Sequence, residues 1–210
     1  NTEIFILTVS DQSVTQVTFN DVDDRDPAWS PDGAFIAFSS DQGNNGRDLF
    51  LLDLENNNQV VRLTDLPGTQ MQPTWSPDGE QLIFASNEPG NFDLYSMVRS
   101  DQASRVQLTT TPGDDLTPNW LEGVGVVFAT RAENGLEIGT LQPTDPASFV
   151  QLTFDAFSDE EPVWSPDGSL ILFRSDRVGG VVDLFLMNAD GSNIRPFITA
   201  NGTERSPAWR

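Results

Sequence analysis

The sequence predicts an all-β protein, a β-propeller of four-stranded antiparallel blades with about 45 residues per repeat. Three observations lead to this prediction. The chain has five tryptophans at intervals of 46, 45, 44 and 45 residues, each placed two residues after a proline: Trp29, Trp75, Trp120, Trp164 and Trp209. Short apolar segments separated by turn signals fill each interval. No window shows a sustained helical period of apolar residues, so we expect few helices or none.

The first strand of each unit ends at the tryptophan, and a turn follows it. Three units continue as Trp-Ser-Pro-Asp-Gly, at residues 29–33, 75–79 and 164–168. Serine, proline and glycine suit the first, second and fourth positions of a type I turn. The third unit departs from the pattern, because residues 120–123 read Trp-Leu-Glu-Gly and Phe128 follows one residue early. We expect an altered rim there and not a lost blade.

The other strands of the unit also have recurring signatures. The second strand is an alternating apolar segment that ends in phenylalanine, at residues 35–38, 81–84 and 170–173. The third begins with an acid before apolar residues, and the fourth closes on an aliphatic residue and a threonine. The acids are Glu3, Asp48, Asp93, Glu137 and Asp183, and the threonines are Thr18, Thr64, Thr109, Thr153 and Thr199. Tryptophan and phenylalanine together fill the space between adjacent sheets, and a ring of sheets buries every apolar face.

These motifs resemble the repeat of the TolB-type β-propellers, a WD-repeat-like family. Two motifs carry the resemblance. One is Pro-x-Trp-Ser-Pro-Asp-Gly, and the other is the segment 183–192, which reads Asp-Leu-Phe-Leu-Met-Asn-Ala-Asp-Gly-Ser and follows Ser175-Asp176-Arg177. The resemblance covers essentially the whole chain. It implies a propeller of six or more blades, a protein-binding role, and a periplasmic or extracellular location in a bacterium.

The phase of the repeat predicts how the chain divides. We expect the outer strands of a partial blade at 1–20, blades at 21–66, 67–111, 112–155 (degenerate) and 156–202, and the first strand of a further or closing blade at 203–210. The chain starts at Asn1 without methionine or signal peptide. We therefore expect part of a longer propeller, whose open blade edges could associate. A five-bladed ring closed by an incomplete blade is the alternative.

Composition excludes several classes of function. The chain has 32 acidic and 11 basic residues, a net charge of −21, and neither cysteine nor histidine. Such a charge repels phosphate backbones, so we expect no nucleic-acid partner. No apolar run approaches the length of a membrane span, so we expect no membrane insertion. Without histidine or a Gly-x-Ser-x-Gly motif the chain has no Ser-His-Asp triad, and no lone acid breaks the repeat as a glycosidase would require. We predict no catalytic residue and no enzymatic activity.

The candidate binding residues are acids near the tryptophans. Five residues before each tryptophan stands an acid, or Gln70 in the second unit: Asp24, Asp115, Asp159 and Glu204. These acids either accept hydrogen bonds from backbone amides or form an acidic ring at one mouth of the central channel. The densest clusters are Asp24 with Asp26, and Asp159 with Glu160 and Glu161.

The sequence therefore predicts a non-catalytic scaffold that presents an acidic channel mouth and variable loops to a protein partner with a basic surface. The variable loops are residues 42–47, 88–91, 121–124 and 178–181. The alternative is the substrate-gating propeller domain of a larger prolyl-oligopeptidase-like serine peptidase. No cofactor or metal site is predicted. Residues 21–26 and 41–48 look superficially like calcium loops, but each departs from the EF-hand pattern. Calcium stays an alternative because oxygen ligands are abundant.

Overall fold

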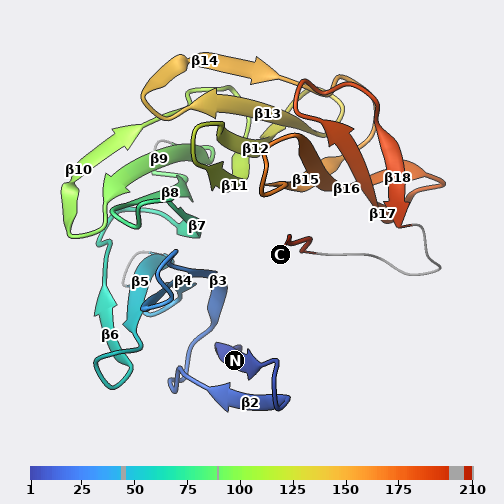
Figure 1. Cartoon of the computed structure of the whole chain (residues 1–210). Helices are drawn as coiled ribbons and strands as arrows, with labels where there is room; N and C mark the ends of the chain where they lie inside the picture. Colours follow the sequence, from blue (N-terminus) through green and yellow to red (C-terminus); the bar gives the residue numbers. More distant parts are fainter. Residues whose placement is uncertain (44–45, 89, 199–205, 210) are drawn as a thin grey trace.

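The computed structural model describes residues 1–43, 46–88, 90–198 and 206–209, and in this part of the chain all regular structure is β-strand. Four sheets of four antiparallel strands and one two-stranded sheet follow one another around a central axis (Figure 1). The predicted all-β propeller fold is confirmed. The described part has no helix that is long and apolar enough to cross a membrane.

Each blade is a meander of consecutive strands, with the tryptophan-bearing strand at one edge of the sheet. This strand is the innermost one and faces the central axis (Figure 1). The two-stranded sheet consists of β1 (Phe5–Thr8) and β2 (Ser13–Gln16). Blade 1 is β3 (Asp24–Trp29), β4 (Phe35–Ser40), β5 (Asp48–Asp53) and β6 (Gln59–Arg62); blade 2 is β7 (Gln70–Trp75), β8 (Gln81–Ser86), β9 (Asp93–Val98) and β10 (Asp101–Gln107). Blade 3 is β11 (Asp115–Leu121), β12 (Gly125–Arg131), β13 (Leu136–Gln142) and β14 (Asp145–Gln151); blade 4 is β15 (Asp159–Trp164), β16 (Leu170–Val178), β17 (Val181–Asn188) and β18 (Arg195–Ile198).

The core lies between adjacent blades. The phenylalanines that end the second strand of each blade are fully buried: Phe38, Phe84, Phe128 and Phe173. Trp75 of blade 2 packs with Ala37 and Leu49 of blade 1. Its indole N–H donates a hydrogen bond to the carbonyl oxygen of Ala28, also in blade 1, at 3.0 Å. The tryptophan thus joins its own blade to the preceding one.

The expectation that every tryptophan is buried fails at Trp29. Trp75 and Trp164 are 5% and 6% exposed, and Trp120 and Trp209 are half-buried, whereas Trp29 is 52% exposed. Trp75 is covered by β3 and β4 of the blade before it. The sheet before Trp29 consists only of β1 and β2, the outer half of a blade, and has no strands equivalent to those two. Burial of the tryptophan depends on the preceding blade as well as on its own repeat.

The turns behave as the sequence predicts. In blade 1 the Gly33 amide donates to the carbonyl oxygen of Ser30 at 2.9 Å, and Gly33 has a φ of 74° that favours glycine. In blade 3, Leu121 pairs with Gly125 across a shorter turn, and all four strands are present. The third unit therefore has an altered rim and is not a lost blade.

The connections between strands lie on two opposite faces of the propeller. One face, here called the turn face, carries the turns between the first and second strands and those between the third and fourth strands of each blade. These two kinds of turn are neighbours, as the Leu54 amide shows by donating to the carbonyl oxygen of Ala34 at 3.0 Å. The opposite loop face carries the connections between second and third strands and those between blades.

Candidate functional sites

A belt of side chains joins the innermost strands around the central axis. The residue three before each tryptophan has a left-handed backbone, with φ between 49° and 54°, at Asp26, Gln72, Thr117, Glu161 and Ser206. This conformation is costly before proline and turns the amide toward the preceding blade. The Thr117 amide donates to Gln72 Oε1 at 2.9 Å, and the Ser206 amide donates to Glu161 Oε2 at 2.6 Å. The Gln72 amide faces Asp26 Oδ2 at 3.4 Å.

The belt surrounds a central pocket. The pocket is lined by Asp26, Gln72, Thr117, Asn119, Glu161 and Ser206 together with the neighbouring prolines. Two of the predicted binding acids, Asp26 and Glu161, therefore lie at the channel. Their carboxylates already accept hydrogen bonds from the next blade, so they also hold the blades together.

The acids five residues before tryptophan lie inside the blades. Asp24, Asp115 and Asp159 are at most 2% exposed, as is Gln70 at the remaining position. Asp24 accepts a hydrogen bond from Asn20 Nδ2 at 2.7 Å and another from the Ser40 hydroxyl. Asp115 accepts one from the Thr111 hydroxyl at 3.0 Å. The hydrogen-bond partners of Asp24 and Asp115 thus come from the same blade or from the connection that precedes it. Glu204, the fifth member of the predicted ring, lies outside the described residues.

Two arginines of β16 pair with the densest predicted cluster. Arg177 donates to both carboxylate oxygens of Asp159 at 2.8 Å. Arg174 forms ion pairs with Glu160 and, at 3.3 Å, with Glu161. Burial acts to raise the pKa of Glu160, but the hydrogen bonds from Arg174 and Ser158 lower it overall. This cluster offers less uncompensated charge to a ligand than its sequence indicates.

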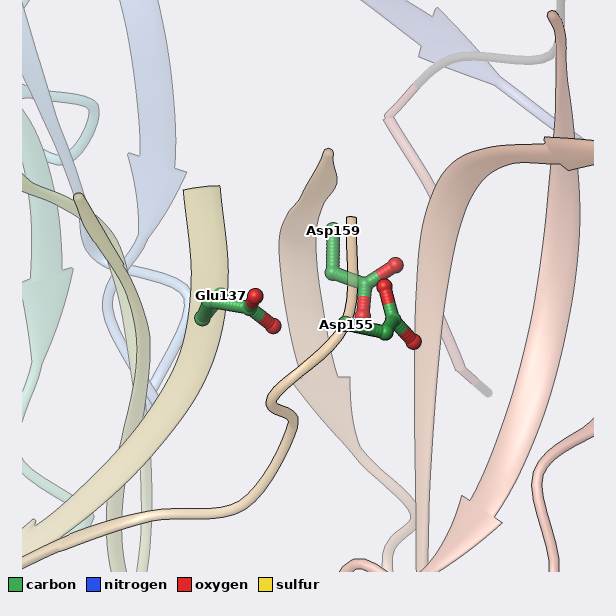
Figure 2. A group of neighbouring side chains, drawn as sticks. All are labelled: Glu137, Asp155 and Asp159. Atoms are coloured by element: carbon green, nitrogen blue, oxygen red, sulfur yellow. The ribbon is translucent and has the colours of Figure 1, made fainter. Parts of the chain in front are cut away.

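A second group of acids forms around Asp159 at the junction between blades 3 and 4. Glu137 at the start of β13, Asp155 in the preceding loop and Asp159 at the start of β15 direct their carboxylates toward one another (Figure 2). One oxygen of each lies within 4.8 Å of the others. Arg177 also pairs with Asp155 at 3.2 Å. Burial raises the pKa of Glu137, and the nearby Asp159 and Asp155 charges add to this effect.

The equivalent junction between blades 2 and 3 holds Asp93 and Asp115. Burial, and then the Asp115 charge, raises the pKa of Asp93 to about 6. Burial likewise raises the pKa of Asp115, whose Oδ1 has no hydrogen-bond partner among the described residues. Asp93 accepts hydrogen bonds from the side-chain amide of Gln107 at 3.0 Å and from the hydroxyl of Thr109 at 3.5 Å. No ion pair of the described residues reaches either aspartate.

The recurring acid and threonine of the repeat are hydrogen-bonded partners. In blade 1 the Thr64 hydroxyl donates to Asp48 Oδ1 at 3.0 Å and accepts from the Leu49 amide at 2.8 Å. The Thr18 hydroxyl similarly donates to Glu3 Oε2 at 2.7 Å. This bond ties the fourth strand to the start of the third and explains why both signatures recur.

Exposed charge differs between the two faces. Exposed acids occupy the turn face in every blade: Asp11, Asp32, Glu55, Asp78, Glu80, Asp101, Glu122, Asp145, Asp167 and Asp190. Every ion pair within the described ranges uses an acid of the loop face or of the blade interior. Hydrogen bonds within the turns lower the pKa of Asp32 and Asp78, and that of Asp167 to about 2. The turn face thus keeps its negative charge across the physiological pH range.

Sequence reasoning missed the arginines and the group around Glu137. The signal was present: Arg177 stands in the Ser-Asp-Arg string, and Glu137 is one of the recurring acids. Neither pattern says that side chains of these two adjacent blades meet at one group of acids. Asp23 and Asp41 of the two calcium-like segments pair with Arg25 and Arg47, which compete with any bound cation. The variable loops at 42–47 and 88–91 fall partly outside the described residues.

The fold and the repeated junctions define a β-propeller repeat protein, and comparison with known proteins gives the family. Residues 1–210 match the family described as TolB beta propeller domain, so the chain belongs to that family. A structure of TolB from Acinetobacter baumannii is 20% identical with a TM-score of 0.79, over 91% of this chain and 47% of that one. A structure of a putative TolB from Agrobacterium tumefaciens is 20% identical with a TM-score of 0.81, over 94% of this chain and 70% of that one.

A puromycin-hydrolysing peptidase from Mycobacterium tuberculosis has the same propeller fold. It is 13% identical with a TM-score of 0.69, over 87% of this chain and 30% of that one. No curated protein gave a significant match. The chain spans about half the length of the Acinetobacter TolB. At these identities the solved structures show the fold alone.

Proposed function

We propose that this propeller is a non-catalytic protein-binding scaffold whose turn face binds the basic surface of a protein partner. The main support for this proposal is the different distribution of exposed charge on the turn face and the loop face. Acids of the turn face have no ion pair within the described chain, whereas several acids of the loop face and of the blade interior, such as Asp48 and Asp159, are paired with arginines. A predominantly negative surface on a rigid scaffold attracts an oppositely charged partner and orients it.

The proposed binding surface is therefore the turn face and not the channel mouth that the sequence predicted. The described acids of that predicted ring, Asp24, Asp115 and Asp159, are buried inside the blades. Glu80 and Glu122 are instead exposed on adjacent blades of the turn face. Neither carboxylate has a hydrogen bond or ion pair within the described residues. Glu122 also lines a shallow groove with Asp78 and Trp120 between blades 2 and 3.

The double variant Glu80→Gln, Glu122→Gln tests this surface. The probe is a lysine octapeptide, and its affinity is measured by calorimetry at low and high salt. Exposed charge pairs contribute about 0.2–1 kcal/mol each, so the double variant should bind about two- to thirtyfold more weakly. Affinity of the unchanged protein should fall as salt shortens the Debye length to about 3 Å at 1 M.

A matched control places the same change on the other face. Asp21→Asn, Glu133→Gln removes the same charge from exposed loop-face residues. We expect this variant to bind the peptide nearly as well as the unchanged protein. Equal weakening by both double variants would show that only total charge matters, and the turn-face proposal would be wrong.

The absence of catalysis is part of the proposal and has its own test. The chain has no histidine or cysteine, and buried carboxylates such as that of Asp159 form structural ion pairs. We expect the purified chain to leave peptide and glycoside substrates unchanged, and turnover lost on a single carboxylate substitution would contradict this. By analogy with its family we place the protein in the periplasm or outside the cell of a bacterium.

The alternative function, a substrate-gating propeller in a larger serine peptidase, stays a prediction. The peptidase with the same propeller supports it only at the level of fold. The mass and the peptide map of the full-length natural protein would distinguish between the two functions. A hydrolase domain joined to this propeller would favour the alternative, and a protein of propeller blades without such a domain would favour the scaffold.

A further inference from the structure

We propose that Glu137, Asp155 and Asp159 bind a calcium ion at the junction between blades 3 and 4. The proposed site lies between two blades and is independent of the turn-face function. Its three acids come from β13, from the loop before β15, and from β15 itself (Figure 2). An ion bound there would link the two blades.

The positions of the carboxylates suit one ion. Their nearest ligand oxygens all lie within 4.8 Å of one another. Calcium binds oxygen at about 2.3–2.6 Å, so two ligands on opposite sides of the ion are about 4.6–5.2 Å apart. Magnesium binds at about 2.0–2.1 Å, demands a stricter octahedron and usually keeps several waters, so a group of three carboxylates suits calcium better. The ligands are all oxygens, which favours a hard cation over zinc.

An unpartnered buried oxygen points to a ligand. Glu137 is 2% exposed, and its Oε2 has no hydrogen-bond partner among the described residues. Its carboxylate is directed toward the two aspartates (Figure 2). A buried carboxylate oxygen without a partner is costly, because it has lost its water and gained nothing in return. A cation between Glu137 and the aspartates would satisfy it.

The charge of the group also leaves room for a divalent ion. Three carboxylates and the guanidinium of Arg177 leave two negative charges at this junction. Arg177 pairs with Asp155 and Asp159, at 3.2 and 2.8 Å. Its contacts with the rings of Phe173 and Phe185 hold it beside the aspartates. Arg177 therefore compensates part of the charge and competes with the ion for the rest.

Calorimetric titration of chelator-treated protein with CaCl₂ tests the site. We expect one calcium ion per chain, with magnesium bound at least tenfold more weakly. Glu137→Gln should weaken calcium binding at least tenfold, because it removes a charge and a ligand. Asp93→Asn changes the same repeat position at the junction between blades 2 and 3, and should leave calcium affinity unchanged. Urea unfolding of each variant shows whether it is folded.

Arg177→Gln gives an independent measurement. Removing the competing positive charge should tighten calcium binding severalfold, and calcium should raise the stability of this variant more than that of the unchanged protein. Absence of saturable calcium binding up to millimolar concentrations would overturn the proposal. Equal affinities of folded Glu137→Gln and unchanged protein would also overturn it, since the ion would then be held elsewhere on the acidic chain.

Discussion

The junction between blades 2 and 3 and the junction between blades 3 and 4 place buried acids at the same two repeat positions, but they compensate them differently. Asp93 and Asp115 face each other with hydroxyl and amide partners only. The equivalent positions hold Glu137 and Asp159, and the guanidinium of Arg177 pairs with Asp159. Ala132 is the blade 3 residue that corresponds to Arg177, because Thr130 and Ser175 are equivalent in their pairing with Glu137 and Asp183.

The junction between blades 1 and 2 shows a third arrangement. The acid of β5, Asp48, pairs with Arg62 at 2.6 Å, and the residue five positions before Trp75 is the neutral Gln70. Two of the three junctions thus have an arginine, supplied from different strands. The repeat determines the positions of the buried acids, but the residue that compensates their negative charge differs from one junction to the next. The junction without an arginine should respond most to pH.

The largest effect should come from removing the arginine of the compensated junction. Arg177→Gln leaves Asp159, which is fully buried, without its charged partner. Breaking a buried ion pair on one side costs about 3–5 kcal/mol, so the free energy of unfolding should fall by that amount in the absence of calcium. Urea denaturation measures it.

Two further variants show whether this loss comes from the buried charge. Arg25→Gln removes an ion pair in which the arginine side chain is 46% exposed, and should cost less than about 1 kcal/mol. Adding Asp159→Asn to Arg177→Gln should recover part of the loss, since blade 2 has a neutral amide at this position. If the double variant is no more stable than Arg177→Gln, the loss arises from packing on the phenylalanine rings.

The sequence predicts the fold well because each repeated residue has a local role. Ser30 and Gly33 form the turn, and Phe38 stacks on Phe50, so these contacts lie within one repeat. Trp29 shows the limit, because its burial needs strands of a preceding blade. The candidate site is harder to predict, because Glu137 and Arg177 belong to different blades and only the assembled junction brings them to the same carboxylates. The spacing places the acids but says nothing of their exposure, so the channel-mouth acids could not be told from structural ones.

An intermediate effect should come from neutralising the uncompensated junction. The pKa of Asp93 is raised from 3.8 to about 6, so the folded state holds this proton more tightly than the unfolded chain. The stability gained from protonation is complete below about pH 4 and is lost as the pH rises through about 6. Asp93→Asn should therefore raise the free energy of unfolding by about 1–3 kcal/mol at pH 7.5 and by less at pH 5.

The matched substitution at the compensated position should have the opposite sign. Asp48→Asn removes the buried one of the two carboxylates that pair with Arg62 and should destabilise the protein at pH 7.5. Urea unfolding of both variants at the two pH values gives the comparison. A destabilised Asp93→Asn protein with an unchanged pH dependence would show that Asp93 is stabilising in its ionised form, and the contrast between the two junctions would be wrong.

The smallest effect should come from adding the missing arginine. Ala132 is half-buried beside the loop-face end of β12, and its amide donates to the carbonyl oxygen of Gly135 at 2.9 Å, a bond that a substitution of the side chain leaves in place. An arginine at this position should lower the pKa of Asp93. It should raise the free energy of unfolding at pH 7.5 by less than about 1 kcal/mol, because the entropy lost in ordering the long side chain offsets much of the electrostatic attraction. The clearer measurement is the difference in unfolding free energy between pH 5 and pH 7.5, which should shrink in Ala132→Arg. Asn134→Arg adds the same charge two residues further along the exposed loop, and should leave that difference nearly unchanged. If both variants alter it equally, the pair responds to the overall charge of the chain and not to an arginine at the junction.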